Sequence, residues 1–261
     1  MGLDVFHLTT AKFETFVLVL IRVSVILFML PVFSAPQVPR LVRLGLGLFV
    51  AFAVMQTVPT IRALDLAEFV VAVVCQVLVG FVFGFVSYLV FMGIQLAGEI
   101  LDLQIGFAVS NIVNPVTQQQ ITVIGEFELA IATLLFLVTD SHLLMLQGIG
   151  GSFSLLPLPY ANVSSATVAS IGVFFAQAVL IVFKIAAPVS VALFVVNVGL
   201  GLMARVAPQM NVFVVGFPLQ IGVGMIMLIV CMPLLGAVLP GLFDDVPAQL
   251  DTVMRGMIPG R

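Results

Sequence analysis

The chain has 261 residues, of which 62% are hydrophobic and only 8% carry a charge, and its mean hydropathy is +1.31. A water-soluble globular protein cannot bury that much apolar surface. The composition therefore excludes this class and indicates a membrane-class protein. The net charge of −3 comes from so few ionised groups that it does not bear on nucleic acid, but the sequence has no basic tract of the kind that tracks phosphates, so we expect no nucleic-acid partner.

Six apolar runs follow one another along the chain and match helices of about 20 residues, the length that crosses a bilayer. Outer-membrane strands would instead show segments of about ten residues with alternating polarity. The first run contains Glu14 and Arg22 and follows no basic start, so we expect it to be retained rather than removed as a secretory signal. The sequence therefore predicts an all-α fold with helices over residues 13–33, 41–58, 69–98, 129–138, 168–196 and 212–239.

Proline and glycine divide and bend the predicted helices. Pro188, Pro218 and Pro233 fall inside apolar runs and predict kinks, because proline removes a helical hydrogen bond. The stretch 148–167 is predicted to be the longest uncharged loop. We expect it on the extracytoplasmic side, because the arginines flank the second run instead. Turns are expected at residues 31–39, 59–65, 111–115, 148–165 and 205–211.

Small residues are spaced four apart in the predicted helix over residues 68–106. Gly80 and Gly84 form one such pair, and Gly93 and Ala97 form another. This spacing lets neighbouring backbones approach along one face of a helix. We therefore expect dense helix packing along this segment.

A polar stripe follows near the end of the same helix. Gln95 lies four residues before Glu99, and Asp102 lies three after it, so all three share one face. Carboxylates in a membrane relay protons or bind cations in some proteins, but no further acidic or histidine residues continue the spacing. We expect salt bridges between helices, or hydrogen bonds to backbone groups, rather than a proton path.

Two isolated cations, Arg22 and Lys184, lie within apolar runs. Their long stems reach an interface if one is near, or the charged groups pair with acidic side chains if they are buried. Structural pairing is the preferred interpretation. The candidate acidic partners are Glu99, Asp102, Glu126 and Glu128.

The segment 106–120 departs from the helical pattern. It contains an Asn-Pro pair, several bulky apolar residues and three consecutive glutamines. Irregular backbone at membrane depth survives only where protein surrounds it or a wet cavity meets it. An ordinary external loop is one interpretation. The other is a loop that closes a pore as a hydrophobic constriction, formed by Gly106, Phe107, Val109, Asn111, Ile112, Val113, Asn114 and Pro115.

Motifs of catalysis and metal binding are not found in the sequence. There is no nucleophile elbow, Walker loop, HExxH helix or dinucleotide fingerprint, so we expect no enzymatic activity and no cofactor. Cys75 and Cys231 are single residues in apolar runs, where packing is the simplest role. His142 is better explained as a residue near a helix start, where Asp140 or Ser141 suits an N-cap, than as a metal ligand.

The stretch from Gly201 to Pro218 resembles the signature of the FliR family of flagellar biosynthetic proteins, with Arg205, Ala-Pro-Gln at 207–209 and Asn211 in place. The resemblance continues in order through the rest of the chain, including the prolines near 31–39, the Gly-Glu pair at 98–99 and the Asn-Pro pair at 114–115. One departure is Asp140, where the family would place a small residue such as glycine.

The resemblance implies a subunit of the flagellar type III protein export gate, through which unfolded flagellar proteins pass. One copy would assemble with several FliP-like and FliQ-like subunits, near FlhB-like and FlhA-like components and membrane lipid. The gate would sit in the flagellar basal body at the inner membrane, with much of the assembly toward the periplasm. Seven polar side chains of this chain would hold its helices and its partners in register: Arg22, Gln95, Glu99, Asp102, Gln104, Lys184 and Arg205.

The same resemblance implies an internal organisation of kinked helices and helical hairpins. Residues 1–160 would be FliP-like, with the pore plug at 106–120, and residues 161–261 would form a FliQ-like hairpin with its tip near 205–211, all in one integrated body. A homologous gate subunit of a virulence injectisome is the nearest alternative. A secondary transporter would show two related halves with broken helices, which this sequence lacks.

Overall fold

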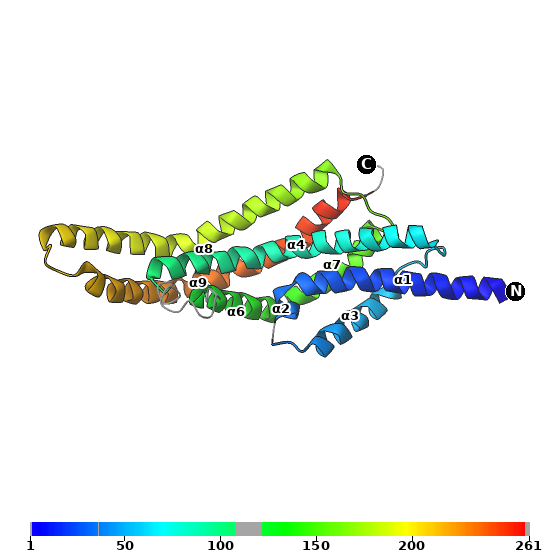
Figure 1. Ribbon diagram of the computed structural model, residues 1–261, viewed down its shortest axis with the longest axis horizontal. Coiled ribbons are helices and arrows are strands. Elements are labelled where there is room, and N and C mark those ends of the chain that lie inside the picture. Colours follow the sequence, from blue (N-terminus) through cyan, green and yellow to red (C-terminus); the bar gives the residue numbers. More distant parts are fainter. Residues whose placement is uncertain (1, 36, 108–121, 259–261) are drawn as a thin grey trace. The chain divides into compact units, whose positions relative to one another are not determined.

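A computed structural model describes residues 2–35, 37–107 and 122–258, and within these ranges it contains helices and connecting turns but no strand (Figure 1). The predicted all-α fold is therefore confirmed. The helices are α1 (Gly2–Met29), α2 (Pro31–Ser34), α3 (Arg40–Met55), α4 (Leu66–Ile105), α6 (Val123–Val138), α7 (Ser141–Leu155), α8 (Ser165–Val206) and α9 (Val212–Arg255).

Among the described residues, three helices are long and apolar enough to cross a membrane: α4, α8 and α9. The pair α6 and α7 adds a fourth candidate span if it is counted as one, although the two are bent by 73° at their junction. The length and composition of these helices agree with an integral membrane protein.

The chain divides into two compact units that alternate along the sequence. The first contains Met1–Leu89, Asp140–Phe175 and Asp244–Arg261, and the second contains Val90–Thr139 and Ala176–Phe243. The boundary predicted near Tyr160 falls within a segment of the first unit. That boundary describes likeness to other subunits rather than compactness, so it stays a prediction.

In the first unit, α1 packs tightly against α4 through the predicted glycine pair. A Cβ atom on Gly80 would lie 2.9 Å from Val25 Cβ, and one on Gly84 would lie 2.8 Å from Met29 Cβ. Both distances are shorter than ordinary carbon contacts of about 3.5–4.0 Å. The absence of side chains at these two positions is what allows the close approach, and the predicted dense packing is confirmed here.

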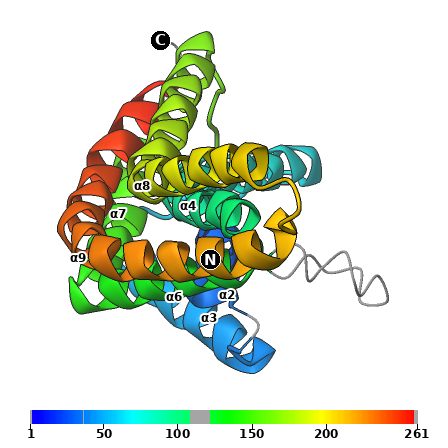
Figure 2. The same ribbon diagram turned by 90° about the vertical axis from the view of Figure 1, so that its left-hand side faces the viewer.

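The second unit has an aromatic cluster and a long hairpin. The rings of Phe91, Phe136 and Phe243 lie 5.1–5.4 Å apart, so they bring α4, α6 and α9 together. Residues 207–211 join α8 to α9 at the hairpin tip (Figure 1, Figure 2). Asn211 Oδ1 accepts hydrogen bonds from the backbone N–H groups of Phe213 and Val214, which caps the start of α9.

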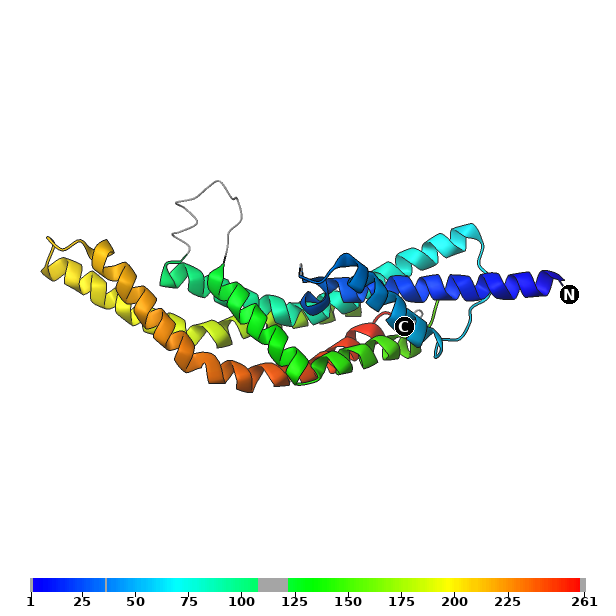
Figure 3. The same ribbon diagram turned by 90° about the horizontal axis from the view of Figure 1, so that it is seen from below.

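Two predictions about helix boundaries differ in outcome. Pro188 lies inside α8, and Pro218 and Pro233 lie inside α9, where both helices are curved rather than straight in the second unit (Figure 3). The long loop predicted over 148–167 is wrong, because α7 continues to Leu155. Gly150 and Gly151 lie inside that helix with open space around them. The prediction took these two glycines as signs of a loop, but here they continue a helix.

Candidate functional site

The carboxylate of Asp102 holds the start of α6 against the end of α4. Its oxygens accept hydrogen bonds from the backbone N–H groups of Ile124, at 3.0 and 3.2 Å, and Gly125, at 3.4 Å. The first N–H groups of a helix have no partner within it, and the N-cap residue Thr122 makes no side-chain cap. Asp102, which is 2% exposed, therefore acts as a cap supplied by another helix.

Two glycines let α4 and α6 meet at this point. A Cβ atom on Gly98 would lie 2.5 Å from the Cα atom of Gly125. On the other side, a Cβ atom on Gly125 would lie 3.2 Å from the carbonyl oxygen of Gln95 and 3.3 Å from Glu99 Cγ. The half-buried Gln95 and Glu99 thus border the contact between the two helices, together with the buried Asp102.

The chain leaves α4 through a glycine that no other residue replaces easily. Gly106 has φ +101°, a conformation that L side chains rarely adopt, and its N–H donates to the Asp102 carbonyl oxygen at 3.1 Å. A Cβ atom on Gly106 would lie 3.2 Å from Cδ1 of Phe217 in α9. The two ends of the segment 107–122 are therefore held close together, one by Gly106 and the other by Asp102.

The predicted plug falls mostly outside the described residues. Gly106 and Phe107 belong to the described part of the chain, and both are half-buried. The other predicted plug residues, Val109, Asn111, Ile112, Val113, Asn114 and Pro115, lie outside it. The plug therefore stays a prediction, supported only by how its two flanks are anchored.

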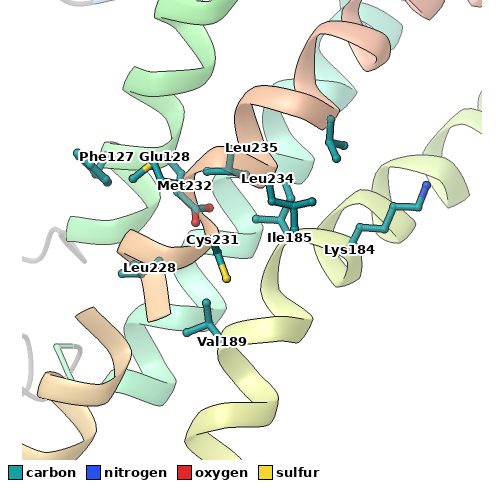
Figure 4. Close-up of a pocket in the computed structure, with 11 residues that line it drawn as sticks. Phe127, Glu128, Lys184, Ile185, Val189, Leu228, Cys231, Met232, Leu234 and Leu235 are labelled. Atoms are coloured by element: carbon teal, nitrogen blue, oxygen red, sulfur yellow. The ribbon is translucent and has the colours of Figure 1, made fainter. Parts of the chain in front are cut away.

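A second buried carboxylate, Glu128, lies one turn along α6. It is 2% exposed, and its Oε2 atom has no hydrogen-bond partner among the described residues. Glu128 lines a cavity of about 20 Å³ between α6, α8 and α9 that is otherwise mainly apolar, with Leu228, Leu235 and Val189 among its walls (Figure 4). A space of this size holds about one water molecule.

Lys184 also borders this cavity, but it does not neutralise Glu128. Figure 4 shows its stem leading away from Glu128, and the side chain is exposed. In the described part of the chain it forms no ion pair with any of the acidic residues considered from the sequence. Its stem covers apolar surface while its ammonium group remains outside.

Arg22 is fully buried in the first unit, where it joins α1 to α4 and α7. Its Nε donates to Gln76 Oε1 at 2.8 Å, and its terminal nitrogens donate to the carbonyl oxygens of Ser152 and Leu156, each at 3.0 Å. The guanidinium carbon also lies 4.1 Å from the centre of the Phe153 ring.

The partners of Arg22 differ from those the sequence suggested. The sequence suggested carboxylates, whereas the structure provides an amide and two backbone carbonyl groups at the end of α7. The Ser152 carbonyl oxygen also accepts the N–H of Leu156, so Arg22 is its second donor. Gln76 was missed, although a glutamine alone in an apolar run is a detectable signal. Ser152 and Leu156 gave no signal, because backbone carbonyls are the same in every residue.

The remaining predicted polar contacts lie on the surface of the second unit. Gln104 is half-buried and lines a groove of about 500 Å³ between α4 and α8, together with Ser190 and Asn197. Arg205 is exposed in the last turn of α8. Neither has a partner among the described residues of this single chain that would assign it a role.

These polar groups hold helices in position. Asp102 and Arg22 each fix the end of one helix to another, and among the described residues no three metal-binding side chains gather in one place. The arrangement suits a helical scaffold in which the end of α4 is fixed to the start of α6.

Comparison with known proteins identifies relatives over almost the whole chain. Residues 13–246 match the family described as bacterial export proteins, family 1. The chain is 36% identical over 236 residues to the flagellar biosynthetic protein FliR of Bacillus subtilis (strain 168), a match that covers 89% of this chain and 91% of the relative. It is 30% identical over 228 residues to the FliR protein of Escherichia coli (strain K12), covering 87% of each.

A more distant relative comes from another secretion system. The chain is 27% identical over 227 residues to the Yop proteins translocation protein T of Yersinia pestis, with 85% of this chain and 87% of the relative covered.

Proposed function

The chain belongs to the bacterial export proteins, family 1, and from this membership we propose that it closes the pore of the flagellar type III protein export gate. Its role as an export-gate subunit rests on the matches to flagellar FliR proteins over nearly nine-tenths of its length. As such a subunit it associates with other components of the export apparatus. The pore-closing role, the individual partners and the site residues are the proposal.

The exposed apolar faces of the α8–α9 hairpin support the proposal that other subunits and lipid surround this chain. Phe183 and Phe194 of α8 are 63% and 67% exposed, and Phe213 of α9 is 76% exposed. Contiguous exposed apolar surface marks contact with protein or membrane. We assign these faces to FliP-like and FliQ-like neighbours and to lipid of the inner membrane, in a basal-body complex that lies largely toward the periplasm.

Native mass spectrometry of the tagged chain, co-expressed with candidate FliP-like and FliQ-like proteins, tests this assembly. The expected result is one defined hetero-oligomer that contains a single copy of the chain. FlhB-like and FlhA-like components are the further expected partners. A solitary chain or a homo-oligomer, obtained while both partners are demonstrably expressed, would contradict the proposal and return the transporter hypothesis to consideration.

The pore plug is assigned to the segment whose ends Gly106 and Asp102 anchor. Deletion of Val109–Val113 removes most of its bulky apolar residues and should let ions and small solutes leak through the assembled gate. The control replaces Gln118–Gln120 in the same segment with alanine, which should leave the gate closed. Unchanged conductance of the deletion variant in an intact complex would refute the plug.

Glu99 is proposed to keep neighbouring helices in register at the edge of the α4–α6 contact. Glu99→Lys places a cation beside the Gly98–Gly125 approach and should lower the yield of the assembled complex. Glu126→Lys is the matched control, because Glu126 is exposed in the same unit. Equal yields for the two variants would count against the role of Glu99.

An injectisome gate subunit is the second candidate, favoured only by the Yersinia relative. Complementation distinguishes the two functions. The chain should restore motility to a flagellar mutant that lacks its FliR protein. Restoration of effector secretion alone, in a mutant that lacks the translocation protein T, would favour the alternative.

A further inference from the structure

A groove of about 400 Å³ lies between α1 and α3 in the first unit, away from the residues assigned to the gate. Ser24, Leu27 and Phe28 of α1 line one side, and Arg40, Arg43, Leu44 and Gly47 of α3 line the other. Each set has the spacing i, i+3, i+4 that forms one stripe of a helix. The two helices lie side by side in Figure 1 and Figure 3.

The groove is basic at one end and narrow at the other. A Cβ atom on Gly47 would lie 3.4 Å from Ser24 Oγ, so the two helices are closest there. Arg40 is the first residue of α3, where the positive end of the helix dipole adds to the charge of its side chain. Among the described residues, no acidic side chain lines the groove.

Arg43 is held in place but keeps hydrogen-bonding capacity. Its Nη2 donates to the carbonyl oxygens of Ala35 and Val38, at 3.0 and 3.3 Å, which fixes the turn before α3. Its guanidinium carbon lies 5.7 Å from the centre of the Phe28 ring. Its Nε is buried and has no hydrogen-bond partner within the described residues. Arg40 is exposed and forms no ion pair in the described part of the chain.

Apolar surface continues from the groove along the outer face of α3. Leu44, Phe49 and Phe52 are 67%, 72% and 61% exposed, and Phe28 beside them is 64% exposed. A ligand that fills the groove therefore meets two guanidinium groups at one end and hydrocarbon along the rest. This combination matches an amphipathic molecule with an anionic head and an apolar tail.

We propose that this groove binds an anionic phospholipid, with its phosphate on Arg40 and Arg43 and its acyl chain along Leu27, Phe28 and Leu44. Guanidinium groups recognise phosphate oxygens in a bidentate manner, and basic pockets between helices at a membrane surface bind anionic headgroups. An acidic segment of a neighbouring protein would pair with the two arginines. It would not explain why the other half of the groove is apolar. The site does not depend on the export function of the chain.

The test measures lipid retained by the full chain, purified with its partner subunits and reconstituted in vesicles. Vesicles of phosphatidylcholine alone are compared with vesicles that also contain phosphatidylglycerol, and bound lipid is measured by native mass spectrometry. The wild-type chain should retain phosphatidylglycerol in preference to phosphatidylcholine. Arg40→Gln should lower this retention about tenfold, the effect of losing one charge-assisted contact.

The matched control is Arg62→Gln, because Arg62 is also exposed but lies outside the groove, where it pairs with Glu68. It should retain phosphatidylglycerol as the wild type does. Equal retention by the two variants, or equal retention of the two lipids by the wild type, overturns the proposal.

Two further outcomes separate lipid from other ligands. Inorganic phosphate that displaces the bound lipid at millimolar concentration would show that the apolar half of the groove contributes nothing, which overturns the assignment to lipid. A photoreactive residue in place of the exposed Leu44 should crosslink to phospholipid. A crosslink to a protein subunit instead assigns the groove to an acidic protein segment and overturns the proposal.

Discussion

Replacement of Gly98 by alanine should separate α4 from α6 and destabilise the second unit. The added Cβ atom would lie 2.5 Å from Gly125 Cα, 2.7 Å from its nitrogen and 2.9 Å from the Ile124 carbonyl carbon. Carbon atoms normally approach to about 3.5–4.0 Å, so one helix has to move by roughly 1 Å. All three obstructing atoms belong to the backbone, which cannot rotate away as a side chain does.

The expected cost comes from two sources. Overpacking of this kind costs about 1–3 kcal/mol. A separation of the helices also lengthens the hydrogen bonds from Ile124 and Gly125 to Asp102, which costs about 1 kcal/mol more. The free energy of unfolding should therefore fall by about 2–4 kcal/mol, less a gain of about 0.5–1 kcal/mol for alanine over glycine in a helix.

The matched control is Gly236→Ala, also inside a helix of the second unit, where a Cβ atom would meet nothing within 4 Å. It should be neutral or should stabilise the chain by about 0.5–1 kcal/mol. The difference between the two variants corresponds to roughly 5–10 °C in melting temperature. With no tryptophan and two tyrosines in the chain, a fluorescent tag and size-exclusion chromatography after heating are the suitable assay. Equal melting temperatures for the two variants would refute the reasoning.

Substitutions at three further positions test features that the structure defines. Asp102→Ala removes the acceptor of two buried N–H groups and should cost about 2–4 kcal/mol, whereas Asp102→Asn keeps one acceptor and should cost about half as much, as thermal stability can show. Arg22→Met should cost about 3–5 kcal/mol, because the Gln76 amide oxygen and the Leu156 carbonyl oxygen lose their donor and the Ser152 carbonyl oxygen loses one of two; wild-type resistance to proteolysis would argue against it. Asp140 has φ +58°, a conformation that glycine adopts without strain and valine does not. Asp140→Gly should therefore stabilise the chain by up to about 1 kcal/mol, and Asp140→Val should destabilise it. A higher melting temperature for the valine variant than for the glycine variant would show that this strain is absent.

The sequence predicted helix type well and some helix ends poorly. An apolar run of sufficient length predicts a helix in a membrane, because in a helix each backbone N–H and C=O group forms its hydrogen bond within the same segment. Glycine is a weaker guide, since Gly150 and Gly151 continue a helix while Gly106 ends one. Only the φ angle distinguishes the two situations, and glycine adopts either.

The position of Asp140 shows how a resemblance can indicate local geometry. The family pattern placed a small residue there, and the structure places Asp140 in the left-handed region between α6 and α7. A glycine occupies that conformation without strain, and aspartate is among the residues that tolerate it.

Composition and the spacing of residues by themselves determined that this chain is helical and membrane-class, because apolar content and segment length depend on no distant contact. The spacing of Gln95, Glu99 and Asp102 also determined that they share one helix face. Tertiary structure alone decided that Asp102 caps α6, that Arg22 binds backbone carbonyls rather than carboxylates, and that Lys184 stays unpaired with Glu128. Each of those choices depends on which helix end lies near the side chain, and a carbonyl or N–H group at a helix end carries no mark in the sequence.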